Sequence, residues 1–184
     1  MKKLFRRIKN LKPIRFIRNV WYFRSELSRF EWWDYTYTLD MFSRCLKSMS
    51  DNLEIRGIEI DEPRMKKVAK MRRAIEIIEH MRGIYHIEQA EKEMGELIIN
   101  PIEWVPSETH PDSFEMIHHD TEEQRAHNKA VYNRAHALEE MEWNELWEIM
   151  RGQNHDEYKK LSKKNKNFNW NDWFDGSGLR GWWD

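Results

Sequence analysis

The sequence predicts an all-α protein, a bundle of about four helices with an aromatic C-terminal tail docked on it. Only 7 Gly and 5 Pro occur in 184 residues, which disfavours turn-rich β structure. Apolar residues also recur every three or four positions along several segments, which is the period of an amphipathic helix. The length suits a single domain over residues 1–184, with a core that needs no disulfides or metals.

Residues 1–30 are predicted to form a basic amphipathic helix that Pro13 breaks or kinks. Ten Lys and Arg residues against one acid, Glu26, give this segment a charge of +9, so the other 154 residues carry −10. Such asymmetry has two explanations. Either the basic end has an anionic partner, or it folds against the chain's own acidic helices.

A second helix is predicted to begin at Asp34, a residue type that caps helices, and to end at Gly57. Its apolar stripe is the most regular in the chain and consists of Tyr35, Leu39, Phe42, Leu46, Met49 and Leu53. A third helix is predicted from Asp61 to about Leu97, because acids and Pro63 fit a first helical turn. Its stripe consists of Val68, Met71, Ile75, Ile78 and Tyr85.

Residues 98–120 contain three of the five prolines, which predicts a long loop. A last helix is predicted from a capping box at Asp120–Glu123 to Gly152, and the polar, lysine-rich residues 153–167 are expected to be a linker. Residues 168–184 contain six large aromatic side chains that a free tail would not keep in water. This tail must therefore dock on the domain, on a second subunit or on a partner.

Nothing in the sequence selects a catalytic or metal site. The single Cys45 excludes an internal disulfide and suits a reducing compartment. His119, Glu123 and His127 share a helical spacing of four, but no H-E-x-x-H motif is present. We therefore expect no catalytic residues, no metal and no cofactor, while an acid–base hydrolase that uses Glu and His stays an alternative.

The segment Gly176–Gly181 matches the pattern G-x-G-x-x-G, but a dinucleotide fingerprint also needs a strand before it and a helix after it. Only three residues follow here, so that interpretation is rejected. Two others stay open. Backbone N–H groups beside Arg180 could cradle an anion as a nest, or a tight turn could fold Trp182 and Trp183 back onto the chain.

The most informative pattern combines aromatic rings with arginines near both ends of the chain. Aromatic rings stack on nucleobases, and arginines pair with phosphates. The predicted ligand-binding residues are Arg24, Trp33, Tyr35, Tyr37, Arg180, Trp182 and Trp183. Trp33, Tyr35 and Tyr37 are expected to stack on the base, the two arginines to hold phosphates, and the last two tryptophans to close the pocket. The alternative is that the two aromatic clusters pack on each other.

Several segments resemble small accessory proteins encoded by tailed bacteriophages. The basic start, Trp33-Asp34-Tyr35 with Leu39-Asp40, Glu142–Glu148 and above all Asp175–Asp184 carry the resemblance, over about a third of the chain. It implies a phage origin and the cytoplasm of an infected bacterium, but no established activity. Phage proteins of this size often counter host defences, and some sequester nucleotide immune signals as oligomers.

We therefore predict a non-enzymatic, homo-oligomeric binding protein that sequesters a small nucleotide-like anion. The alternative is an adaptor or inhibitor that grips a host or virion protein with the aromatic tail and the basic helix. Binding of nucleic acid or of a membrane surface is less favoured, because the whole chain has a net charge of −1 and carries no known nucleic-acid motif. Neither a secretory signal nor the roughly 18 apolar residues of a membrane span are found.

Overall fold

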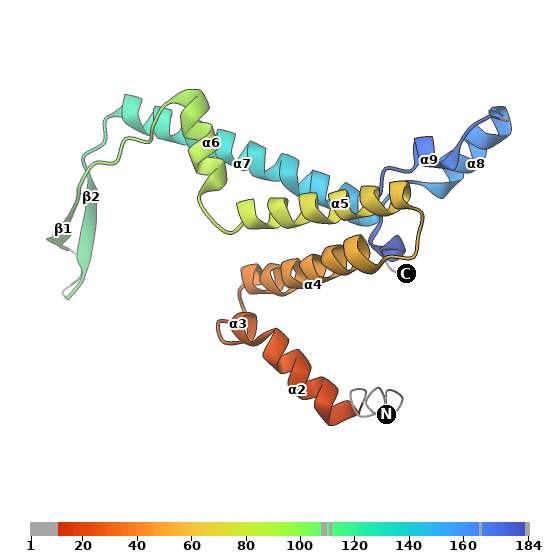
Figure 1. Ribbon diagram of the computed structural model, residues 1–184. Coiled ribbons are helices and arrows are strands. Elements are labelled where there is room, and N and C mark those ends of the chain that lie inside the picture. The colour runs from red at the N-terminus through yellow and green to blue at the C-terminus, as the bar shows by residue number, and fades with distance from the viewer. Residues whose placement is uncertain (1–10, 108–109, 111, 166, 183–184) are drawn as a thin grey trace. The chain divides into compact units, whose positions relative to one another are not determined.

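The computed structural model describes residues 11–107, 110, 112–165 and 167–182. The chain is mostly helical, with one small two-stranded sheet, which confirms the all-α prediction (Figure 1). It divides into two compact units, Met1–Arg82 with Glu145–Asp184, and Gly83–Asn144. That residues 1–184 form a single domain stays a prediction.

The first unit is built on the helical hairpin of α4 (Tyr35–Arg56) and α5 (Asp61–His80), which lie side by side in Figure 1. Asp34 caps α4 as predicted, because its Oδ1 accepts hydrogen bonds of 2.8 Å from both the backbone N–H and the hydroxyl of Thr36. Gly57 ends α4, with its N–H donating to the carbonyl of Leu53 at 3.0 Å. Both predicted ends of this helix are confirmed.

The core of the first unit joins α4 and α5 to the end of α7 (Glu122–Arg151) and to the C-terminal tail. Its buried members are Leu46, Leu53, Val68, Met71, Ala74, Ile77, Ile78, Met81, Leu146, Ile149 and Trp182. Leu39, Phe42 and Met49 pack against this core, so most of the predicted α4 stripe is confirmed. Tyr35 is the exception, because its side chain is 54% exposed.

Among the described residues, two short helices precede α4. α2 (Lys12–Tyr22) has Pro13 in its first turn, where proline costs no hydrogen bond, and α3 (Arg24–Leu27) follows after Phe23. Pro13 therefore begins a helix in the described residues. The predicted earlier part of the basic helix falls on residues 1–10, which lie outside them.

The prediction of one helix from Asp61 to about Leu97 is wrong. α5 ends at His80, a turn follows that includes the exposed Gly83, and α6 (Tyr85–Met94) begins in the second unit. A glycine without a side chain to pack weakens a helix at this point. Gly95, at a φ of +100°, then ends α6.

The predicted linker after Gly152 is also wrong, because α8 (His155–Lys164) occupies most of it. The Asn154 side chain caps this helix and accepts a 2.9 Å hydrogen bond from the Asp156 N–H. Acids in its first turn and lysines in its last turn match the helix dipole. Two short elements follow, α9 (Trp170–Trp173) and the 3-10 turn η1 (Leu179–Gly181).

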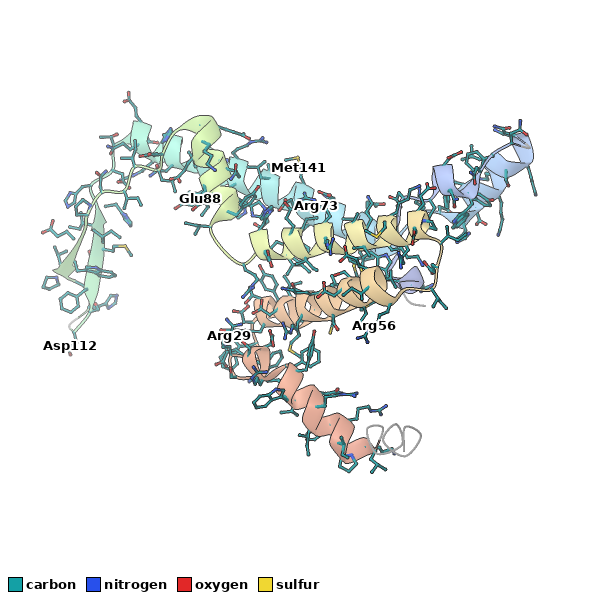
Figure 2. The ribbon with its side chains drawn as sticks, viewed as in Figure 1. Arg29, Arg56, Arg73, Glu88, Asp112 and Met141 are labelled. Atoms are coloured by element: carbon teal, nitrogen blue, oxygen red, sulfur yellow. The ribbon has the colours of Figure 1, made fainter. Side chains whose placement is uncertain are left out.

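The second unit contains α6, the start of α7 and a β-hairpin where a loop was predicted. Strands β1 (Ile102–Pro106) and β2 (Phe114–His118) pair in antiparallel register, with Trp104 opposite Met116. Pro106 is tolerated because it ends a strand in a two-stranded sheet, where one edge is always unpaired. Asp112, near the tip in Figure 2, has a φ of 70°.

The capping box of α7 lies one residue later than predicted. The Thr121 N–H donates to Gln124 Oε1 at 2.9 Å, and the Gln124 N–H donates to the Thr121 hydroxyl at 3.2 Å. Asp120 instead accepts from the Asn100 amide at 2.8 Å. Gly152 follows the last residue of α7 as predicted.

Candidate ligand-binding cavity

The predicted ligand-binding residues fall into two groups within the first unit. Arg24, Trp33, Tyr35 and Tyr37 lie before or in the first turn of α4. The other group belongs to the tail, which packs near the opposite end of α4, because Gly176 contacts the backbone of α5 at Lys66 and Lys67. A 22-residue helix is roughly 33 Å long. The two groups therefore do not share one pocket within a chain.

Three of the four residues of the first group, Arg24, Trp33 and Tyr35, are exposed. Arg24 donates to the carbonyl of Trp21 at 2.7 Å, and its guanidinium lies 4.4 Å from the centre of the Trp21 ring. Trp33 is 66% exposed and contacts Trp32 edge to face, with ring centres 5.4 Å apart. Tyr37 is half-buried. These side chains line none of the cavities described below.

Trp182 lies in the core and not at a ligand site. Its side chain is 1% exposed, and its Nε1–H donates to the Gly176 carbonyl at 2.8 Å. This burial satisfies the single polar group of the ring. Trp183, which was predicted to close the same pocket, lies outside the described residues.

The tail also supports the tight-turn interpretation of the glycine-rich segment. The Gly178 N–H donates to the Ile149 carbonyl at 2.8 Å, and the Gly181 N–H donates to the Gly178 carbonyl at 2.8 Å. The Ser177 N–H donates to Asp175 Oδ1 at 2.9 Å. These three N–H groups serve the turn, so they are not available to an anion.

Arg180 lines a different feature, a cavity of about 710 Å³ that we call the tail cavity. It is lined by residues of the link between α4 and α5, the start of α5, the link between α7 and α8, and the tail. Its side-chain lining includes Glu59, Lys67, Arg151, Gln153, His155, Trp170, Trp173, Phe174, Ser177 and Arg180. Of these, only Arg180 was predicted as a site residue.

Aromatic rings form one wall of the tail cavity. Trp170 and Phe174 are stacked, with ring centres 5.4 Å apart and planes at 16°, and Trp170 and Trp173 are 5.2 Å apart. His155 of α8 lies 5.4 Å from Trp170. All three large rings are half-buried, so they are held by one another while part of their surface faces the cavity.

Hydrogen bonds hold this wall in place. The Gln153 side chain donates to the Trp173 carbonyl at 2.7 Å and accepts from the Asp175 N–H at 3.0 Å. Lys70 pairs with Asp175 at 3.3 Å. Burial alone would raise the pKa of Asp175, but hydrogen bonds from Ser177 and the charge of Lys70 outweigh it and lower that pKa.

The cavity carries an excess of positive charge. Lys67, Arg151 and Arg180 face a single acid of the lining, Glu59, which pairs with Lys67. Arg151 pairs with Glu148 at 2.5 Å and remains 59% exposed. Arg180 has no ion pair or side-chain hydrogen bond with any residue in the described part of the chain. Two arginines are thus accessible to an anion.

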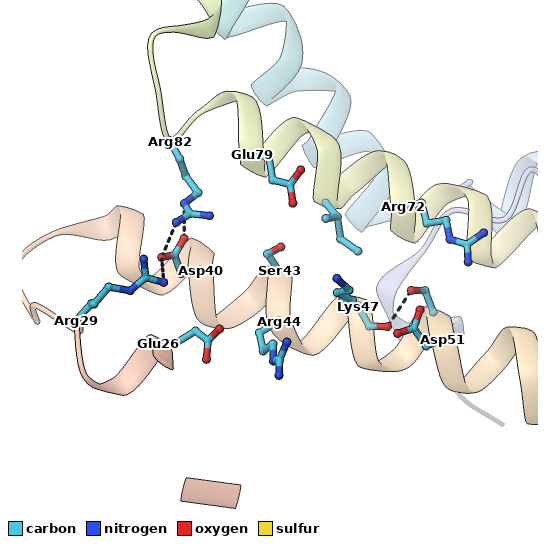
Figure 3. Close-up of a pocket in the computed structure, with 12 residues that line it drawn as sticks. Glu26, Arg29, Asp40, Ser43, Arg44, Lys47, Asp51, Arg72, Glu79 and Arg82 are labelled. Atoms are coloured by element: carbon cyan, nitrogen blue, oxygen red, sulfur yellow. Dashed lines mark hydrogen bonds and ion pairs between the residues drawn. The ribbon is translucent and has the colours of Figure 1, made fainter. Parts of the chain in front are cut away.

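A second cavity, of about 310 Å³, lies beside α3, α4 and α5 in the first unit (Figure 3). Among its charged side chains, Asp40 forms ion pairs with Arg29 and Arg82. The buried Asp40 accepts a 3.0 Å hydrogen bond from Arg82, and its carboxylate lies 2.5 Å from the Arg82 Nε and 3.9 Å from Arg29. No aromatic ring is among the residues that line it. These ion pairs involve Arg82, which stands where an apolar residue would continue the stripe from Ile78 to Tyr85.

Among the described residues, no group of three or more His, Cys, Asp or Glu side chains is placed to hold a metal ion. His119 instead pairs with Glu103 at 3.1 Å, and His127 contacts the Glu96 carbonyl at 2.9 Å. In the same residues, no helix combines the length and the apolar character needed to cross a membrane.

Comparisons with known protein families, with curated proteins and with solved structures find no match.

Proposed function

We propose that this protein binds a small nucleotide-like anion in the tail cavity without turning it over. Trp170, Trp173 and Phe174 provide the stacking surface, and Arg151 and Arg180 hold the phosphates. The observation that carries the proposal is that three half-buried aromatic rings and two accessible arginines line one cavity.

The dimensions of the cavity suit such a ligand. Small-molecule pockets usually measure about 300–1,000 Å³, and this one measures about 710 Å³. Stacking on an aromatic ring contributes about 1–3 kcal/mol per base and does not depend on sequence. A guanidinium adds two-pronged hydrogen bonds to phosphate oxygens.

The proposal keeps the predicted ligand class and Arg180 but changes the stacking residues. The predicted rings at the start of α4 are far along that helix from Arg180, whereas the tail rings lie in the same cavity. The resemblance to phage accessory proteins extends the proposal to a role. A homo-oligomer in an infected bacterium would sequester a nucleotide-derived defence signal.

A ligand-release experiment tests the proposal. The purified protein is incubated with cyclic dinucleotides and ADP-ribose derivatives, freed of unbound ligand and heat-denatured, and the released compounds are identified by mass spectrometry. Release of an intact nucleotide in near-stoichiometric amount supports the proposal. A cleaved product assigns the protein to the enzymes, and no release contradicts nucleotide capture.

A second candidate function is protein–protein adaptation, and one observation favours it. The β-hairpin of the second unit carries an exposed apolar face, with Trp104 61% and Phe114 65% exposed. Ile102 and Met116 lie on the same face, 48% and 46% exposed. Replacing Trp104 and Phe114 with Ser should then dissociate an oligomer or complex measured by light scattering, and leave nucleotide release unchanged.

A further inference from the structure

Helix α2 separates apolar and polar residues onto opposite sides. At 100° per residue, one side consists of Pro13, Ile14, Phe16, Ile17, Val20 and Trp21. The other side consists of Lys12, Arg15, Arg18, Asn19 and Tyr22. None of the residues of α2 is buried, and Phe16, Ile17 and Trp21 are each at least 66% exposed.

The helix is attached to the first unit by its polar side. The Tyr22 hydroxyl donates to the Arg44 carbonyl at 3.3 Å, and the Arg44 guanidinium lies 4.5 Å from the centre of the Tyr22 ring. Tyr22 lies nearly opposite the middle of the apolar side of α2. The apolar side is therefore turned away from α4 and is uncovered by the described residues.

Large apolar side chains are also exposed in the segment that follows α2. Leu27, Phe30, Trp32 and Trp33 are between 42% and 82% exposed. Soluble monomers rarely leave a contiguous apolar surface in water, so the apolar side of α2 needs an occupant.

The charges beside the surface identify that occupant. Lys12, Arg15 and Arg18 form the polar flank of α2, and no acid lies in the helix. If two copies paired through their apolar sides, their basic flanks would come close together, and the like charges would repel each other. A nucleic acid would bind the basic flank and leave the apolar side in water. An anionic lipid surface satisfies both sides of the helix at once.

We propose that α2 is an interfacial helix for anionic membranes. Phe16, Ile17 and Trp21 enter the boundary between headgroups and acyl chains. Lys12, Arg15 and Arg18 extend along the surface to the lipid phosphates, as long basic side chains do at such boundaries. The inference does not depend on the tail cavity.

Co-sedimentation of the full chain with vesicles tests the inference. Vesicles of pure phosphatidylcholine are compared with vesicles that contain about one third phosphatidylglycerol, a composition chosen to give an anionic surface. The chain is expected to bind the anionic vesicles and to be released by salt. Absence of binding to them, or equal binding to both compositions, overturns the proposal.

Two double variants separate the apolar and the basic contributions. Phe16→Ser with Ile17→Ser should lower vesicle binding about 100-fold or more, because two large apolar side chains no longer enter the lipid. Arg15→Ala with Arg18→Ala should lower it about 30-fold, roughly fivefold for each lost cation. All four positions are exposed, so these variants should fold, and nucleotide release should persist in both.

Matched controls lie in the second unit. Ile99→Ser removes an apolar side chain that is 87% exposed, and Arg125→Ala removes an exposed cation. Neither should change vesicle binding, and a loss as large as that of the α2 variants contradicts the proposal. A Phe16→Ser, Ile17→Ser chain that loses self-association without vesicles would identify a second copy as the occupant and overturn it too.

Discussion

Gly152 and Gly178 meet backbone to backbone, so closely that a Cβ on Gly152 would lie 2.5 Å from the Gly178 Cα. Gly152 has a φ of +74° and Gly178 a φ of +106°, conformations that side chains disfavour. The contact joins the end of α7 to the tail, and the Gly178 N–H completes it by donating to Ile149. These two glycines therefore determine where the tail lies against the core.

The variant Gly152→Ala should destabilise the first unit by about 2 kcal/mol, since it combines a left-handed backbone with a collision against backbone atoms. Urea unfolding followed by circular dichroism measures the change. Gly83→Ala is the matched control, because a Cβ there meets nothing within 4 Å. If both variants unfold at the same urea concentration, the tail does not pack on α7 as described.

Replacing Trp182 with Ala should lower the free energy of unfolding by about 3–5 kcal/mol, because the ring is buried in the core. Trp182→Phe should cost less, since it keeps most of the ring and removes the hydrogen bond to Gly176. Thermal unfolding of both variants checks the order. If Trp182→Ala leaves stability unchanged and weakens ligand binding, then Trp182 closes the ligand pocket, as the sequence predicts.

The fold could be predicted where one physical signal dominates. The apolar period of α4 and its Asp34 cap depend only on residues close together in the sequence, so both predictions are confirmed. The predicted burial of Tyr35 is wrong, because the apolar stripe extends one helical turn beyond the core. The prolines predict a loop in place of the hairpin, although Glu103 in β1 and Glu115 in β2 each lie between two apolar residues, which is the start of a strand period. A linker was predicted in place of α8 because the segment is rich in lysine. The signals for a helix are the Asn154 cap and the two acids in the first turn.

The sequence predicts the types of residue in the candidate site, but it does not predict which residues line it. The sequence indicates aromatic rings with arginines and includes Arg180, but it assigns the stacking to the wrong cluster. Trp170 and Trp173 reach the cavity only because Gly176 packs against the backbone of Lys66 and the tail turns back. The apolar period of a helix or strand does not predict a contact between two backbone segments that are far apart in the sequence.

The Arg73–Glu145 ion pair should make stability depend on acid pH. A 2.7 Å hydrogen bond from Arg73 lowers the pKa of Glu145 below its ordinary 4.5. Its stabilisation is therefore complete above about pH 4.5 and is lost as the pH falls through the lower pKa of the folded chain. Because both side chains are about a third or more exposed, screening limits the effect to about 0.5 kcal/mol.

The variant Glu145→Gln checks this prediction by thermal unfolding between about pH 3 and pH 7, across the range in which carboxylates titrate. Its melting temperature should fall slightly near neutral pH and change less than that of the unmodified chain on acidification. Glu140→Gln, at an exposed position of α7, is the control. If the melting temperatures of the unmodified and Glu145→Gln chains fall equally on acidification, the ion pair contributes nothing measurable to stability.

Arg180→Ala should weaken nucleotide binding in the tail cavity by about 10- to 100-fold, the usual loss when a charged hydrogen bond to phosphate is removed. Stability should not change, because Arg180 is exposed and has no ion pair among the described residues. Arg151→Ala should weaken binding less, since that arginine is shared with Glu148. Titration calorimetry with the nucleotide recovered from the release experiment measures the three affinities.

Two comparison variants decide between the cavity and the surface first predicted. Trp33→Ala removes a ring of the predicted site, and Trp104→Ala removes a ring of the hairpin, with both side chains exposed by more than 60%. Neither should alter the affinity if Trp170 and Trp173 stack on the base. A large loss in Trp33→Ala together with normal binding by Arg180→Ala would place the ligand at the start of α4, and the tail cavity would lose its assignment.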